Sequence, residues 1–127
     1  MSEAVTDGVR VRVAARYVPE RSSPIARQYL FAYEVTVRNE GEEAVRLLTR
    51  HWIITDANNK VEEVEGVGVV GETPIIHPGE AFTYTSFCPL RTEFGTMHGS
   101  YGMVRQSGKT FDARIATFAL SIPNAVN

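Results

Sequence analysis

The sequence has few of the residues that cross-link a chain or carry it through a membrane. Cys88 is the single cysteine among 127 residues, which excludes an internal disulfide and a cysteine-based zinc knuckle. No stretch approaches the roughly 20 apolar residues of a membrane span, and residues 1–5 lack the basic and apolar regions of a secretion signal. We therefore expect a cytoplasmic protein without membrane contact that depends on its core for stability.

The sequence also lacks a strong net charge. Its 13 Lys and Arg residues are nearly balanced by 15 Asp and Glu residues, for a net charge of −2. No overall field attracts a polyanion, so no nucleic-acid partner is expected. Hydrophobic residues make up 43% and charged residues 22% of the chain, which is typical of a folded globular protein. A chain of this length predicts one domain with its own core.

No helical periodicity is present, and apolar residues alternate with polar ones instead. This alternation is typical of strands with one buried face. We predict strands at residues 9–17, 29–38, 44–55, 61–70, 81–88 and 96–106, and two short segments around residues 111–122. The predicted fold is all-β: an antiparallel β-sandwich of the immunoglobulin or fibronectin type III kind, with about seven or eight strands and Greek-key connections. A small barrel is the alternative.

The middle of the chain carries the strongest local signals. Apolar side chains fall on both faces of residues 44–55, which predicts a central strand or a bulge. Asp and Asn in residues 56–60 predict a hairpin turn. Trp52, the only tryptophan, is expected to anchor the core. Residues 89–95 are predicted to leave the sheet before the strand at 96–106.

A G-x-G-x-x-G motif is formed by Gly66, Gly68 and Gly71. In dinucleotide-binding folds such glycines open a helix whose N-terminus holds pyrophosphate. Here valines fill the motif and Pro74 follows it, so no helix can begin there, and the nearby glutamates repel phosphate. We favour a structural role, in which the glycines permit a bulge or a sharp bend.

The alternative is phosphate binding by the same glycine segment without a helix. Backbone N–H groups of Gly66, Gly68 and Gly71 would hold a nucleotide or pyrophosphate, helped by Arg50 or Arg46. These glycines and Arg50 are therefore the candidate phosphate-binding residues.

Other reactive residues show no spacing that indicates a site. His51, His77, His98 and Cys88 could hold zinc or cobalt only if folding gathered them, because no two have ligand spacing. No nucleophile elbow or other catalytic motif occurs. We predict no catalytic residue, no metal ligand and no cofactor, and expect the protein not to be an enzyme.

Two kinds of surface could still meet a protein partner. Arg10, Arg12 and Arg16 share one strand face, where they either face solvent or meet an acidic partner, and solvent is favoured. The edge strand of an antiparallel sandwich can also accept a partner's strand through main-chain hydrogen bonds.

Four sequence blocks resemble the ApaG family: H-W-x-I-x-D at 51–56, G-x-G-x-x-G at 66–71, P-G-E-x-F-x-Y-T-S at 78–86 and G-x-x-x-G-S-Y at 95–101. The resemblance implies a single ApaG domain over residues 3–127, with a fibronectin type III-like fold and a role in protein–protein interaction. It also implies a link to nucleotides and to cobalt resistance or magnesium efflux. Two residues depart from the family pattern, Asn59 and Phe87, where glycine is common.

Overall fold

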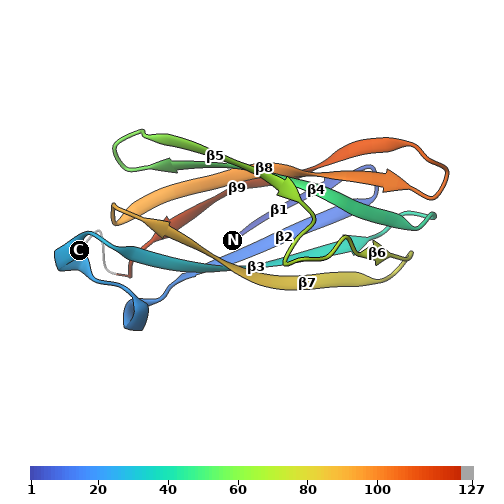
Figure 1. The fold of residues 1–127 in the computed structure, drawn as a ribbon. Coiled ribbons are helices and arrows are strands. Elements are labelled where there is room, and N and C mark those ends of the chain that lie inside the picture. The colour runs from blue at the N-terminus through green and yellow to red at the C-terminus, as the bar shows by residue number, and fades with distance from the viewer. Residues whose placement is uncertain (124–127) are drawn as a thin grey trace.

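The computed structural model describes residues 1–123 and shows an all-β sandwich, as predicted (Figure 1). Its strands are β1 (Ser2–Thr6), β2 (Val9–Tyr17), β3 (Tyr29–Asn39), β4 (Val45–Asp56), β5 (Val61–Val67), β6 (Ile75–Ile76), β7 (Ala81–Leu90), β8 (Phe94–Arg105) and β9 (Thr110–Ser121). Two 3-10 turns, η1 (Pro19–Arg21) and η2 (Pro24–Ala26), lie between β2 and β3.

The strands form two antiparallel sheets that face one another. The four-stranded sheet has the order β1-β2-β3-β7, and the five-stranded sheet has the order β5-β4-β8-β9, with β6 also paired to β4. The chain crosses between sheets after β3 and returns to place β7 beside β3 and β8 beside β4. This is the Greek-key arrangement expected for a fibronectin type III-like sandwich.

Trp52 lies at the centre of the core, as the sequence predicts. It is 3% exposed, and its ring meets those of Tyr33, Phe118 and Tyr101 edge-on at centroid distances of 5.3, 5.9 and 6.2 Å. Tyr33 comes from the four-stranded sheet and the other rings from the five-stranded sheet. The aromatic cluster therefore joins the two layers.

The predicted bulge and hairpin are both present. The β4–β8 register shifts between Leu47 and Thr49, which explains why apolar residues fall on both faces of β4. In the β4–β5 hairpin, the Asp56 N–H donates to the Lys60 carbonyl at 3.0 Å. Asn59 adopts the left-handed conformation with φ +63°, which asparagine tolerates, so its departure from the family's glycine leaves the turn intact.

Several predicted boundaries were wrong, each for a local reason. The β1 strand was missed because its short, mixed sequence shows little alternation. The fifth strand ends at Val67 and does not reach Val70, because the glycine segment turns away from β4. The two short final segments form one strand, β9, whose pattern changes face where the β8–β9 register shifts. Pro89 belongs to β7 and does not leave the sheet.

Candidate functional site

The glycine motif is shaped by contacts within the protein. A Cβ atom at Gly66 would lie 2.6 Å from the Arg50 guanidinium carbon. That guanidinium donates to the backbone carbonyls of Val67 and Gly68 at 3.0 and 2.8 Å. Gly66 therefore leaves the space in which Arg50 fastens the end of β5 to the segment that follows.

The other two glycines serve a tight turn at residues 69–72. Val69 and Glu72 exchange two backbone hydrogen bonds of 2.8 and 2.9 Å, and Gly71 has φ +80°. Gly68 has φ +66°, and a Cβ there would clash with the Glu72 carbonyl oxygen. The turn places Val69 in the core at 1% exposure. These contacts support the structural role favoured from the sequence.

The histidines and the cysteine do not form a cluster. His51 Nε2 lies 3.6 and 3.7 Å from carboxylate oxygens of Glu63 and Glu65, and burial raises the pKa of the Cys88 thiol to about 11. Within residues 1–123, no three His, Cys, Asp or Glu side chains are placed to hold a metal ion. Across the same residues, no helix is long and apolar enough to cross a membrane.

The arginine stripe on β2 is partly neutralised by its neighbours. Arg10 forms ion pairs with Glu3 and Glu40, and Arg12 lies 3.4 Å from Glu3. The hydrogen bond from Arg10 holds the pKa of Glu40 below its usual range. Two members of the stripe thus already have acidic partners within the chain.

One long edge of the sandwich is unprotected, and it belongs to β7. The Asn39 N–H donates to the Glu80 carbonyl at 3.0 Å, and this pair continues the β3–β7 register by one step beyond Arg38 and Ala81. Because hydrogen-bonded pairs alternate along an antiparallel ladder, even-numbered residues of β7 bond to β3. The odd-numbered ones, Ala81, Thr83, Thr85 and Phe87, direct their N–H and C=O groups away from β3.

No described backbone group outside the ladder bonds to these four residues. Their side chains are all exposed, and none of the ten residues of β7 is charged. We call this feature the β7 edge, meaning the outward backbone groups of residues 81, 83, 85 and 87.

The strand β5 projects beyond β7 and is poorly covered. At the opposite side of the sandwich, β1 and β2 lie against β9, and the Tyr84 hydroxyl of β7 reaches the Tyr101 hydroxyl of β8. This offset leaves β5 poorly covered except at Glu62, which lines a cleft with Pro89 and Leu90 of β7. None of the seven residues of β5 is buried. Val64 pairs with Trp52 and so faces inward, yet it is 36% exposed.

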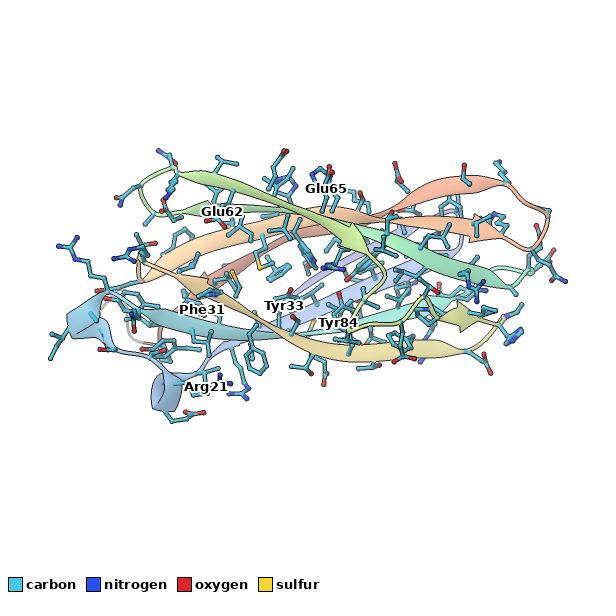
Figure 2. The ribbon with its side chains drawn as sticks, viewed as in Figure 1. Arg21, Phe31, Tyr33, Glu62, Glu65 and Tyr84 are labelled. Carbon is cyan, nitrogen blue, oxygen red and sulfur yellow. The ribbon has the colours of Figure 1, made fainter. Side chains whose placement is uncertain are left out.

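A cleft of about 520 Å³, which we call the arginine cleft, lies where β7 ends. Arg21 and Arg27 line it from the η1–η2 segment, and Arg91 lines it from the residue after β7. Figure 2 shows Arg21 beside this segment and Glu62 and Glu65 on β5. Arg21 also lies over the Phe87 ring at 5.3 Å from its centroid. None of the three arginines forms an ion pair with any of residues 1–123.

The sequence model of the protein family described as ApaG domain matches residues 19–105 of this chain. The chain belongs to the ApaG family. Protein ApaG of Anaeromyxobacter dehalogenans (strain 2CP-C) is 53% identical over 127 residues, which is the whole of both chains. The crystal structure of the putative ApaA protein from Bordetella pertussis is 49% identical, with a TM-score of 0.90, covering 91% of this chain and 94% of that one. An X-ray structure of a structural genomics target is 52% identical, also with a TM-score of 0.90, and covers 94% and 91% of the two chains.

Two surface features of this ApaG family member were not located from its sequence. The candidate phosphate residues Gly66, Gly68, Gly71 and Arg50 do come together around one segment. The β7 edge and the arginine cleft were missed as specific sites. The uncharged run at residues 81–90 was the available signal, because edge strands usually carry charge.

Proposed function

We propose that this ApaG family member is a non-enzymatic interaction module that takes an extended strand of another protein onto its β7 edge. The main evidence is the ten-residue strand β7 at the edge of its sheet. Its outward backbone groups have no described hydrogen-bond partner, and none of its side chains is charged. Such an edge is a template for main-chain pairing.

The other long edges of the sandwich differ from β7 in ways that discourage pairing. The strand β5 carries Glu62, Glu63 and Glu65, and charges on an edge oppose the approach of another strand. The remaining two edge strands, β1 and β9, lie beside one another, and the Arg114 N–H of β9 donates to the Thr6 hydroxyl of β1 at 3.0 Å. The contrast supports β7 as the surface kept open for a partner.

Proline substitution distinguishes strand pairing at the β7 edge from nonspecific binding of other proteins. Thr85→Pro removes one outward N–H group of β7 and leaves the hydrogen bonds to β3 in place. Glu65→Pro is the matched control, because the N–H groups of odd-numbered residues of β5 also point away from the ladder. The Gly68 N–H donates to the Leu48 carbonyl at 2.7 Å, one step beyond the Thr49–Val67 pair, so the even-numbered residues of β5 bond to β4.

The experiment is affinity capture from a bacterial lysate with the three immobilised proteins, followed by mass spectrometry. Specific proteins retained by the wild type and by Glu65→Pro, but lost from Thr85→Pro, would support the proposal. Identical capture by folded Thr85→Pro and wild type would overturn it. The cytoplasmic location and the absence of enzymatic activity, both expected from the sequence, belong to the same proposal.

A second candidate function is nucleotide or pyrophosphate binding at Gly66, Gly68, Gly71 and Arg50. It is favoured by the arginine beside the glycines. It is opposed by the use of that guanidinium and of the Gly68, Val69 and Glu72 N–H groups in internal hydrogen bonds. Amide NMR shifts across residues 66–72 at millimolar pyrophosphate would support this candidate, and unchanged spectra would end it. The implied link to cobalt or magnesium is tested by adding each ion to the same sample.

A further inference from the structure

We propose that the partner strand is an acidic-ended peptide: an uncharged extended segment that pairs with β7, followed by Asp or Glu residues that bind the arginine cleft. This inference rests on the proposed function of the β7 edge. It names the chemistry of the partner at that same site.

The cleft and the β7 edge form one continuous surface. Phe87 is an outward residue of β7 and is 47% exposed, and the Arg21 guanidinium lies over its ring. Leu90 and Pro89 line the cleft together with Arg91. A strand that pairs along β7 toward Leu90 therefore passes Phe87 and arrives among the arginines.

The charges of the cleft select a negative ligand. Arg21, Arg27 and Arg91 are all exposed and have no acidic partner among residues 1–123. Among residues 1–123, Glu62 is the only acidic residue that lines the cleft. Three arginines against one glutamate leave a local positive charge in a protein whose net charge is −2. Arginine binds carboxylates in a planar, two-pronged geometry.

The inward face of β5 favours an uncharged segment in the middle of the peptide. A peptide on β7 occupies the uncovered position beneath β5, where Val64 offers an apolar contact. Glu63 and Glu65 alternate with Val64 and so lie on the opposite face of β5, where both are near His51. Glu62 lies at the cleft end. The favoured sequence therefore has β-branched residues along β7 and its acidic residues at the cleft end.

A second copy of this chain fits the β7 edge less well than a single strand. Two copies paired antiparallel through β7 keep their five-stranded sheets on the same side of the joined sheet. Each copy would then bring its own β5 into the one space beneath the partner's overhang. A lone peptide strand meets no such obstacle.

The probe is a phage-displayed library of random ten-residue peptides, selected on the full-length protein. Enriched peptides are synthesised and titrated against the wild type and four variants. Thr85→Pro blocks the β7 edge, and Glu65→Pro is its control. Arg27→Glu/Arg91→Glu reverses the cleft charge, and Lys109→Glu/Arg114→Glu makes the same change in net charge on β9 and the turn before it.

We expect β-branched peptides with Asp or Glu at one end. Their affinity should fall at least about tenfold in Arg27→Glu/Arg91→Glu and should weaken with added salt, while Lys109→Glu/Arg114→Glu should bind like the wild type. Peptides that need the β7 edge but bind equally well after cleft reversal would overturn this inference and leave the proposed function standing. Peptides that bind Thr85→Pro as well as the wild type would overturn the proposed function itself.

Two further results would also overturn the acidic-peptide inference. One is tight binding of a single-stranded oligonucleotide, lost on cleft reversal, together with no acidic enrichment among peptides. The other is a dimer by light scattering that Thr85→Pro dissociates, because the edge would then belong to a second copy.

Discussion

Pro89 lies opposite Leu30 in the β3–β7 ladder without breaking it. It has an odd number, so its nitrogen lies on the side of β7 that points away from β3. Proline is accepted in sheets at such outward edge positions because no ladder hydrogen bond is lost. The same alternation explains why proline should be tolerated at Thr85 but should strongly destabilise the protein at its neighbour Ser86.

We predict that Thr85→Pro folds with a loss of about 1 kcal/mol or less, whereas Ser86→Pro loses about 3 kcal/mol or more because it removes a ladder bond. Urea denaturation followed by tryptophan fluorescence measures both values. Ser86→Ala is the control for loss of the serine side chain alone. Equal stability of the two proline variants would show that the ladder parity is wrong.

Alanine substitutions at two glycines of the motif should lower the free energy of unfolding by different amounts. Gly68→Ala places a Cβ against the Glu72 backbone carbonyl and also strains φ, so we expect a loss of about 3 kcal/mol or more. Gly71→Ala meets no atom within 4 Å and strains only φ, so about 1 kcal/mol is expected. Thermal unfolding of the two variants compares them directly. A larger loss for Gly71→Ala would contradict the close approach at Gly68.

Arg50 and Gly66 should be energetically coupled. Gly66→Ala displaces the guanidinium from the Val67 and Gly68 carbonyls, and Arg50→Ala removes the same bonds. Each single variant should lose about 1 to 2 kcal/mol, and the double variant should lose clearly less than the sum. Additive losses in denaturant unfolding would show that Gly66 does not serve Arg50.

The Tyr84 and Tyr101 hydroxyls hydrogen-bond one another across the core. Tyr84→Phe leaves the Tyr101 hydroxyl buried without that partner, at an expected loss of about 1 to 3 kcal/mol. Removing both hydroxyls should restore part of the loss, because an unpaired buried group costs more than an absent pair. Chemical denaturation of the two single variants and the double variant measures this. A double variant less stable than either single one would contradict the contact.

Stability should fall at alkaline pH. Burial raises the pKa of Cys88 from 9.0 to about 11, and it raises the pKa values of Tyr33 and Tyr84 as well. The unfolded chain loses each of these protons at a lower pH than the folded chain does. The stabilisation from Cys88 is therefore complete below about pH 9 and is lost as the pH rises through about 11. Denaturant unfolding at intervals between these values measures the slope. The unfolding free energy should fall less steeply with pH in Cys88→Ala. An unchanged slope would show that Cys88 does not contribute to the loss of stability.

The strands could be predicted because alternation is a local property of the sequence. Trp52 and the bulge in β4 were likewise visible as apolar residues on both faces. The β7 edge could not be predicted, because which of Thr85 or Ser86 faces β3 depends on the register with a strand about fifty residues earlier. Arg21 and Arg27 lie in one cleft with Arg91 only because β3 pairs with β7.

The glycine segment shows a different limit. The sequence correctly favoured a bend over a helix, since the valines and Pro74 exclude a helix there. The reason for Gly66, however, lies in the side chain of Arg50 on the neighbouring strand. No spacing rule connects these two residues before β4 and β5 are paired.

The central claim is that β7 presents free backbone groups to a partner, and NMR-detected amide hydrogen exchange tests it most directly. In the isolated protein we predict fast exchange at Ala81, Thr83, Thr85 and Phe87, and slow exchange at the even-numbered residues between them. A selected peptide should slow exchange at the first set. Uniformly slow exchange along β7 in the isolated protein would contradict the claim, because the edge would already be covered.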